Sequence, residues 1–213
     1  MASTPTSTYR TEQESFWAGE FGTDYIKRNQ DATQLAGNLA RFSEILNNAG
    51  SLASVLELGA NVGMNLRALH QLLPAADLFA VEINATAIDV LNSLGYVSTI
   101  HDSILNFSPD RQWDLVFTSG VLIHINPDEL AGVYEVMYRA SQRYVLVAEY
   151  YNPTPVEVPY RGHTGKMFKR DFAGDLLDRY PDLKLVRYGF NYRRDNHFPH
   201  GDISWFLLEK RPI

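Results

Sequence analysis

A glycine-containing turn between an apolar segment and a helical pattern constrains the fold of this 213-residue chain more than any other feature. The apolar segment Ala53–Leu56 runs into Glu57–Asn65, which has the sequence ELGANVGMN, and leucines at helical spacing follow from Leu66 to Leu73. A turn that joins a strand to a helix in this way lets the backbone approach a ligand, and the helix N-terminus favours polar or anionic groups. The sequence therefore predicts an α/β domain with a ligand at this turn.

A second acidic residue narrows the ligand to a nucleoside. Glu82 lies 25 positions after Glu57, where the next predicted strand ends, and its carboxylate can accept hydrogen bonds from ribose hydroxyls. A dinucleotide fingerprint requires Gly-x-Gly-x-x-Gly, but Asn61 and Met64 occupy the second and third glycine positions. A phosphate-binding P-loop is also excluded, because no lysine follows the turn.

The remaining pattern, Glu-x-Gly-x-x-x-Gly over Glu57–Gly63, resembles motif I of class I S-adenosylmethionine-dependent methyltransferases. This resemblance implies S-adenosylmethionine as the cofactor and S-adenosylhomocysteine (SAH) as its product. The chemistry agrees, since this cofactor has no pyrophosphate and carries a sulfonium and an ammonium that an acidic neighbour such as Glu57 favours. A tight strand–helix turn without any ligand is the alternative interpretation.

The order of expected elements predicts a doubly wound, Rossmann-like α/β fold. We expect a seven-stranded, mostly parallel sheet with an antiparallel last strand and an N-terminal helical cap. Asp31 is expected to begin a helix that ends at Gly50. The expected strands are 53–58, 77–82, 96–100, 113–118, 144–149, 183–190 and 203–209, and the expected helices are 63–73, 85–94, 127–140 and 169–179. We expect one domain over 1–213, with a cap over 1–50, a cofactor-binding core over 51–150, and a substrate loop and hairpin over 151–213.

Ligands of open α/β sheets bind outside the carboxyl ends of the strands, which selects the candidate cofactor residues. Ile83 is expected to pack on adenine, Asp102 to accept a hydrogen bond from its amino group, and Gly59 and Gly120 to approach the methionine moiety. Asp102 has the alternative role of forming a turn, and Asp114 is interpreted as structural. The full predicted set is Glu57, Gly59, Ala60, Asn61, Gly63, Glu82, Ile83, Asp102, Ser103, Ile104, Thr118, Ser119 and Gly120.

Four further blocks resemble the methylases associated with pseudaminic acid biosynthesis. They are Phe16–Asn29, Tyr151–His163, Lys169–Gly174 and Asp202–Lys210. The resemblance extends over nearly the whole chain from about residue 9 and implies a class I methyltransferase fold with a small-molecule substrate. It leaves open whether the substrate is a sugar, a nonulosonic acid or a natural-product intermediate.

Aromatic and basic residues of these blocks are the expected substrate contacts. Aromatic side chains in the cap can cover the cofactor or stack on a substrate ring, or they can merely pack the cap onto the sheet. Arg161 can pair with a carboxylate or a heterocycle carbonyl, or it can be a solvated loop residue. Gly19 and Gly22 are expected to form a tight turn between short helices. The predicted substrate residues are Phe16, Trp17, Phe21, Tyr25, Tyr150, Arg161 and His163.

A general base is needed only if the acceptor is a hydroxyl or a protonated nitrogen. The predicted catalytic residues are His124, His163 and Tyr150, with Glu149 as a further candidate. His124 has the alternative role of a histidine at a helix entry that bonds to backbone. The remaining histidines lack metal-ligand spacing, so we expect no metal.

Composition limits the partners. The chain has a net charge of −6, which disfavours nucleic acid, and it has no cysteine. No apolar run reaches the roughly 18 residues of a membrane span, and the first eight residues do not form a signal peptide. We expect a cytoplasmic monomer or homodimer that acts on a small molecule, without nucleic acid or membrane as a partner. Two alternatives stay open: an N-methyltransferase of a heterocyclic metabolite, and a non-catalytic regulatory protein that binds the same cofactor.

Overall fold

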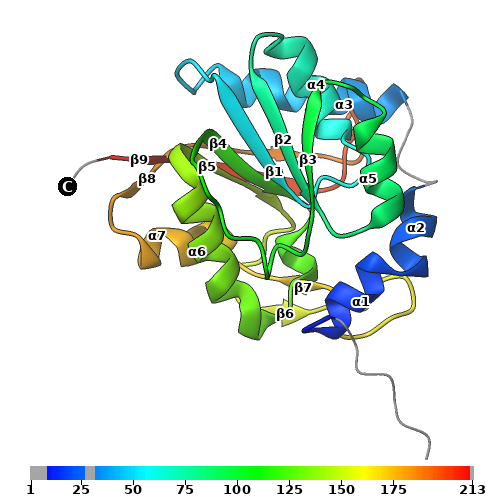
Figure 1. Ribbon diagram of the computed structural model, residues 1–213. Helices are drawn as coiled ribbons and strands as arrows, with labels where there is room; N and C mark the ends of the chain where they lie inside the picture. Colours follow the sequence, from blue (N-terminus) through cyan, green and yellow to red (C-terminus); the bar gives the residue numbers. More distant parts are fainter. Residues whose placement is uncertain (1–8, 27–31, 212–213) are drawn as a thin grey trace, which may run out of the picture.

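A seven-stranded sheet forms the centre of the computed structural model, which describes residues 9–26 and 32–211 (Figure 1). The spatial order is β3-β2-β1-β4-β5-β9-β8. Parallel pairing joins β3 through β5, whereas β9 runs antiparallel to both of its neighbours, β5 and β8. The strands are β1 Ser54–Leu58, β2 Asp77–Glu82, β3 Val97–His101, β4 Trp113–Ser119, β5 Ser141–Glu149, β8 Leu183–Asn191 and β9 Ile203–Lys210. The predicted fold class and the antiparallel last strand are confirmed.

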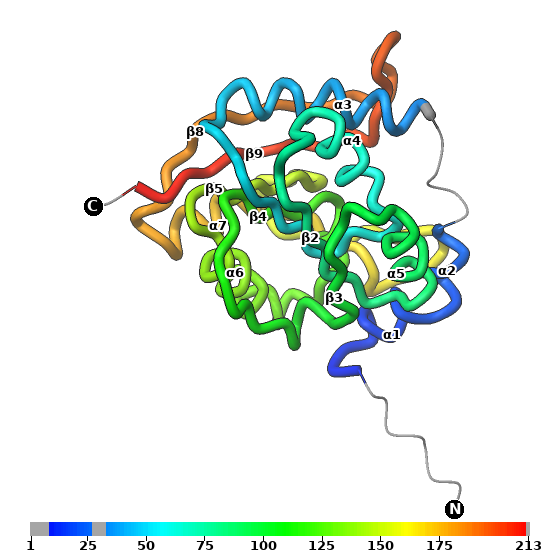
Figure 2. Tube along the Cα trace, turned by 45° about the horizontal axis from the view of Figure 1, so that its top comes forward, coloured from blue at the N-terminus to red at the C-terminus, as the bar shows by residue number. Residues whose placement is uncertain are grey.

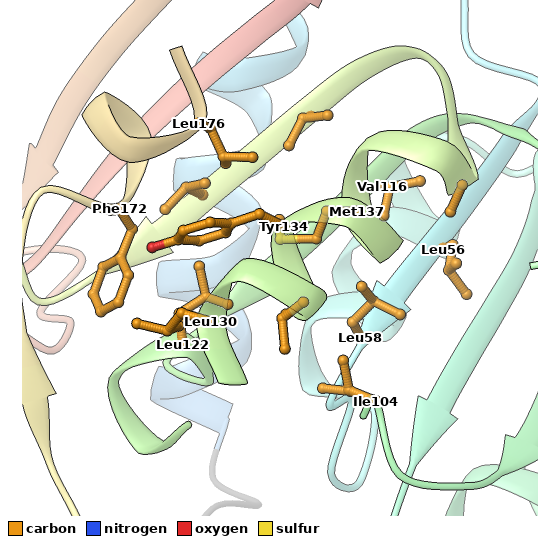
Figure 3. Packing of buried hydrophobic residues seen from close by; sticks show 14 of the residues in the cluster. Leu56, Leu58, Ile104, Val116, Leu122, Leu130, Tyr134, Met137, Phe172 and Leu176 are labelled. Atoms are coloured by element: carbon orange, nitrogen blue, oxygen red, sulfur yellow. The ribbon is translucent and has the colours of Figure 1, made fainter. Parts of the chain in front are cut away.

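Helices cover both faces of this sheet, as the apolar strands require. One apolar cluster joins the sheet to α3 (Ala32–Leu46), α4 (Met64–Leu72) and α5 (Ala85–Asn92). The opposite cluster joins it to α6 (Leu130–Ala140) and α7 (Phe172–Arg179), and Figure 2 shows the two groups of helices on opposite sides. In Figure 3, Leu58 and Val116 of the sheet face Tyr134 and Met137 of α6. The strand β1 is buried along its whole length, and its carboxyl end lies on the side of the sheet where the parallel strands end.

Two predicted helices begin later than the sequence indicated. The segment from Pro127 to Glu129 is a 3-10 turn, capped by the side chain of Asn126, and α6 follows it. The helix predicted from Lys169 begins instead at Phe172, because Asp171 Oδ1 accepts a hydrogen bond from Gly174 N at 2.8 Å and so caps α7. Lys169 belongs to β7 (Phe168–Lys169), which pairs with β6 (Val156–Glu157) in the loop after β5.

The N-terminal cap consists of two short helices, α1 (Glu12–Ala18) and α2 (Glu20–Ile26). Thr11 and Glu14 form a reciprocal capping box that begins α1. Gly19 separates the helices, as predicted, but the prediction for Gly22 is wrong. Gly22 lies inside α2, where a Cβ atom would come within 1.9 Å of the Trp17 carbonyl oxygen. Glycine at this position therefore allows α2 to pack closely on α1, and it does not form a turn.

Three further features complete the frame. Asp114 is structural, as predicted, because its Oδ2 accepts hydrogen bonds from Ala53 N at 2.7 Å and Ser54 N at 2.9 Å. The predicted helix start at Asp31 falls outside the described residues. Within the described part of the chain, no helix has the length and apolar character that a membrane crossing demands.

Candidate functional site

The turn after β1 has the backbone conformation that its glycines indicate. Gly59 has φ +77° and Gly63 has φ +76°, values that favour glycine. A Cβ atom on Gly59 would lie 2.7 Å from a methyl carbon of Val121, so the turn packs closely against the loop after β4. A Cβ atom on Gly63 would lie 2.7 Å from Leu91 instead, which means that Gly63 serves the packing of α4 on α5. The two glycines of the motif thus have different roles.

A cavity of about 360 Å³ opens at this turn, where the order of the strands reverses between β1 and β4. Such a switch point is where open α/β sheets bind ligands. Most predicted cofactor residues line the cavity, whereas Gly63 and Thr118 do not. The predicted residues that line it are Glu57, Gly59, Ala60, Asn61, Glu82, Ile83, Asp102, Ser103, Ile104, Ser119 and Gly120, together with Trp17, Tyr25, His124 and Tyr150.

Backbone groups from two turns fix the carboxylate of Glu82. Its Oε2 accepts a hydrogen bond from Asn61 N at 2.7 Å, and its Oε1 accepts one from Asn84 N at 2.8 Å. Burial raises the pKa of Glu82, and these hydrogen bonds oppose the rise. A carboxyl oxygen has more than one lone pair, so Glu82 can accept further hydrogen bonds from a ligand in the cavity.

Glu57 is a buried carboxyl group with an incomplete set of partners. Its Oε1 accepts a hydrogen bond from Asn65 Nδ2 at 2.6 Å, and its Oε2 has no partner. Burial raises the pKa of Glu57 to about 8, although Asn65 and the nearby guanidinium of Arg41 act in the opposite direction. Arg41 is itself buried, and its Nη2 donates to Asn65 Oδ1 at 2.8 Å. A cationic ligand would supply the partner that Oε2 of Glu57 lacks.

The character of the walls fits S-adenosylmethionine. In the part of the chain that the structure describes, the cavity is lined by Glu14, Glu57, Glu82 and Asp102 but by no lysine or arginine. This favours a positively charged ligand over a phosphate. The unpartnered Oε2 of Glu57 agrees with a ligand that carries an ammonium or sulfonium group.

Asp102, in the segment after β3, forms the turn considered for it, and its role at adenine stays a prediction. Its Oδ1 accepts a hydrogen bond from Ser103 N at 2.7 Å, which forms a turn, and Asp102 also lines the cavity. Ser103 in turn donates through Oγ to Glu14 of α1. The N-terminal cap therefore contacts the predicted adenine end directly.

His124 lies in a 3-10 turn, Leu122–His124, and is buried against the cap. Its ring centroid lies 4.6 Å from that of Trp17 and 4.8 Å from that of Tyr160. The Nδ1 atom lies 2.5 Å from the carbonyl oxygen of Lys166, and burial lowers the pKa of His124 to about 4. Because a carbonyl only accepts, Nδ1 carries the proton and Nε2 carries a lone pair.

Four predicted substrate residues lie outside the cavity wall, and three of them, Phe16, Phe21 and His163, pack the cap on the loop after β5. Phe16 and Phe21 stack with centroids 4.0 Å apart, and the ring of His163 lies 5.0 Å from Phe16. The guanidinium of Arg161 is exposed and lies 5.7 Å from the ring of Tyr160. Of the aromatic residues predicted in the cap, Trp17 and Tyr25 reach the cavity wall.

Glu149 has a structural position. Its Oε1 accepts hydrogen bonds from Val121 N at 3.0 Å and Leu122 N at 3.1 Å, so it fixes the loop after β4. Burial raises its pKa to about 7, and it does not line the cavity. Among the described residues, no group of three histidine, cysteine or acidic side chains is arranged to hold a metal.

Several wall residues were missed by sequence reasoning. They come from α1, α3, α4, the N-cap of α5, the loop after β5, the loop between β8 and β9, and the start of β9. Only the capping box around Thr11 and Glu14 has a recognisable sequence signal, and that signal marks a helix start rather than a site. Among the missed residues are Gln13, Glu14, Asn38, Asn65, Asn84, Tyr160, Met167, His200 and Ile203.

Comparison with known proteins supports a methyltransferase. Residues 55–143, from β1 into β5, match the model of a family described as a methyltransferase domain. No curated protein matches the chain. The matched residues include Glu57, Gly59 and Glu82 of the cavity wall.

Solved structures of methyltransferases share the fold over most of the chain. The plantazolicin methyltransferase BpumL in complex with SAH has a TM-score of 0.65 at 14% identity, with 94% of each chain covered. The glycopeptide N-methyltransferase MtfA with S-adenosylmethionine has a TM-score of 0.62 at 13% identity, covering 83% of this chain and 94% of that one. An S-adenosylmethionine-dependent methyltransferase from Clostridium acetobutylicum has a TM-score of 0.62 at 12% identity, covering 90% and 98%. The resemblance to pseudaminic acid methylases stays a prediction.

Proposed function

We propose that the protein is an S-adenosylmethionine-dependent methyltransferase that methylates an oxygen or nitrogen atom of a small molecule. The observation that carries the proposal is the cavity at the strand switch point, where Glu57 and Glu82 lie beside a glycine turn. The cofactor, when bound, supplies a methyl group on positively charged sulfur. Glu82 would hold the ribose hydroxyls, and Glu57 would face the ammonium of the methionine moiety.

Aromatic residues would orient the acceptor. Trp17, Tyr25 and Tyr150 line the same cavity as the predicted cofactor residues, and flat apolar rings exclude water and align a bound molecule. Burial raises the pKa of Tyr150, so its hydroxyl stays protonated near neutral pH. Tyr150 is therefore assigned to hydrogen-bond donation rather than to proton abstraction.

Proton removal is assigned to His124. Its Nδ1 is held by the Lys166 carbonyl, which leaves the lone pair of Nε2 to accept a proton from a hydroxyl or ammonium acceptor. Its lowered pKa keeps the imidazole neutral at physiological pH. His163 is less suited, because it is exposed and packs outside the cavity.

The acceptor is proposed to be a sugar-type molecule or a natural-product intermediate. The plantazolicin and glycopeptide methyltransferases with the same fold favour the second of these. An N-methyltransferase of a heterocyclic metabolite is the alternative, and the aromatic wall suits a planar ring. NMR of the product made from a demethylated heterocycle would separate O- from N-methylation, because the chemical shift of the new methyl group depends on the atom that carries it.

Calorimetry with SAH tests the first step of the proposal. We expect SAH to bind the unmodified protein and to bind much more weakly after Glu82→Ala, because the substitution removes both ribose contacts. Absence of SAH binding to the unmodified protein would contradict the proposal. Binding without methyl transfer to any member of an acceptor panel would favour the non-catalytic regulatory alternative.

A further inference from the structure

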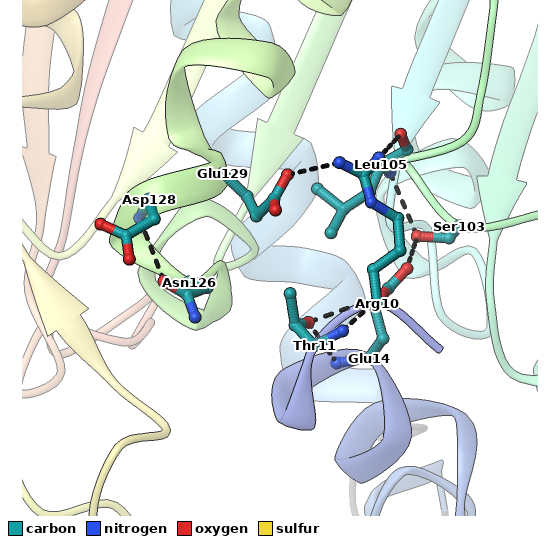
Figure 4. Close-up of polar contacts among 8 residues, drawn as sticks. All are labelled: Arg10, Thr11, Glu14, Ser103, Leu105, Asn126, Asp128 and Glu129. Atoms are coloured by element: carbon teal, nitrogen blue, oxygen red, sulfur yellow. Dashed lines mark hydrogen bonds and ion pairs between the residues drawn. The ribbon is translucent and has the colours of Figure 1, made fainter. Parts of the chain in front are cut away.

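The first turn of α1 lies on the segment that follows β3, at the predicted adenine end of the cavity (Figure 4). Glu14 accepts a hydrogen bond from Ser103 Oγ, and Arg10 Nη1 donates to the carbonyl oxygen of Leu105 at 2.8 Å. Arg10 also pairs with Glu129 at 2.9 Å, which ties the same turn to the start of α6. The cap is thus anchored from two sides around this end of the cavity.

Gln13, the neighbour of Glu14 in α1, has one satisfied and one unsatisfied amide atom. Its Nε2 donates to the carbonyl oxygen of Gly165 at 2.8 Å. Because a carbonyl only accepts, this contact fixes the orientation of the amide. The other atom, Oε1, is buried without a partner, and Gln13 lines the cavity with 8% of its surface exposed. A buried acceptor without a donor is unfavourable, so this atom requires a donor from a ligand.

We propose that Gln13 Oε1 accepts a hydrogen bond from the 6-amino group of the cofactor's adenine, which makes α1 part of the cofactor site. The proposal rests on the proposed function. The donors of the cofactor are the ammonium, the ribose hydroxyls and the 6-amino group. Glu57 and Glu82 are assigned to the first two. The 6-amino group has two hydrogens, of which Asp102 is predicted to accept one, and Gln13 lies in the helix next to Glu14, which bonds Ser103 at the adenine end.

The fixed orientation of the amide gives the site a preference. In S-inosyl-L-homocysteine, the analogue of SAH with a 6-oxo group, an acceptor would face Gln13 Oε1. Rotation of the amide would place Oε1 against the Gly165 carbonyl, so the side chain cannot adapt without losing that bond. Gln13 is therefore a specificity residue for the purine.

Calorimetry with SAH and S-inosyl-L-homocysteine tests this, with the ratio of their two dissociation constants as the readout. We expect the unmodified protein to prefer SAH and Gln13→Met to reduce that preference by about tenfold. Weaker docking of α1 would lower both affinities equally and leave the ratio unchanged. An unchanged ratio in Gln13→Met therefore overturns the proposal, even if both affinities fall.

Glu12→Gln is the matched control. Glu12 belongs to the same helix and pairs with Lys166 at 3.2 Å, but its side chain is 89% exposed and does not line the cavity. The control should keep the full preference for SAH, and a loss of preference there would also overturn the assignment to Gln13. If SAH does not bind the unmodified protein at all, the proposed function fails, which is distinct from failure of the role of Gln13.

Discussion

Glu57 gives the site a pH dependence that can be measured on cofactor binding. The raised pKa of about 8 means that the carboxyl is largely protonated at neutral pH in the ligand-free protein. An ionised carboxylate attracts an ammonium, so SAH should bind more tightly as the pH rises from about 6 to about 8, by roughly tenfold. Calorimetry across this range checks the expectation, and Glu57→Gln should flatten the dependence. A flat profile in the unmodified protein would contradict it.

Glu57 should make the stability of the folded protein fall as the pH rises, whereas the affinity for SAH rises. The folded protein holds a proton on Glu57 up to about pH 8, whereas the unfolded chain releases it near the ordinary value of 4.5. The folded state therefore binds more protons between these values, and Glu57 lowers stability as the pH rises through this window. Glu57→Gln should raise the melting temperature at pH 8 but change it little near pH 4.5. Thermal unfolding at both pH values measures this, and equal shifts would exclude titration of Glu57 as the cause.

His124 can be tested with a substitution that keeps its structural contact. In His124→Asn, the amide nitrogen can still donate to the Lys166 carbonyl, but no group replaces Nε2. We expect methyl transfer to a hydroxyl acceptor to fall by about 10²–10⁴-fold, while SAH affinity stays within a factor of about two. A small effect on the rate would remove His124 from the role of base.

Among single residues, the sequence predicted those site residues whose role follows from residues nearby in the chain. Glu57 and Glu82 are recognisable because each ends a strand before a turn with a known ligand chemistry. Gln13 cannot be recognised in this way, because its hydrogen bond to Gly165 joins residues 152 positions apart. Aromatic character marked Phe16 and Phe21 as substrate contacts, and the structure shows that both rings pack on His163.

At the scale of elements, the packing of α2 on α1 controls the wall of the cavity. A Cβ atom on Gly22 would lie 1.9 Å from the Trp17 carbonyl oxygen, so Gly22→Ala must push the two helices apart. Because Trp17 lines the cavity, we expect a lower melting temperature and a weaker affinity for SAH. Gly132→Ala in α6 is the control, since nothing lies within 4 Å of its Cβ position. That substitution should stabilise the protein by roughly 0.5–1 kcal/mol, because alanine favours a helix over glycine.

Strands were predicted more closely than helix starts. The expected strand over 77–82 coincides with β2, because an apolar run beside turn residues defines both of its ends. The start of α7 depended on the Asp171 cap, which competes with the pairing of Lys169 in β7. The pairing of β6 with β7 involves two residues on each strand, and so short a segment leaves no periodic signal.

At the scale of the whole molecule, Asn84 connects the cap to the carboxylate of Glu82. Asn84 donates through its backbone N to Glu82, and its Nδ2 donates to the carbonyl of Trp17 at 3.1 Å and to Thr23 Oγ1 at 3.2 Å. Its Oδ1 also caps α5 by accepting from Thr86 N and Ala87 N. Cofactor that engages Glu82 therefore acts on a residue that holds both cap helices.

This connection predicts that cofactor binding and closure of the cap are coupled. Asn84→Ser keeps a side-chain oxygen that can cap α5 but removes the amide that holds the cap, because serine is too short to reach Trp17. We expect SAH to slow hydrogen exchange in α1 and α2 of the unmodified protein and to do so much less in Asn84→Ser. Exchange in α5 should stay unchanged, since its cap is preserved.

Exchange in α7 provides the internal reference, because this helix belongs to the apolar cluster on the face of the sheet opposite α5. If SAH slows exchange in the cap equally in both proteins, the cap closes through its contacts at Ser103 and Gly165 alone. If exchange in α5 also rises, the loss of protection reflects an impaired helix cap. Only a loss confined to α1 and α2 assigns the link between Glu82 and the cap to the Asn84 amide.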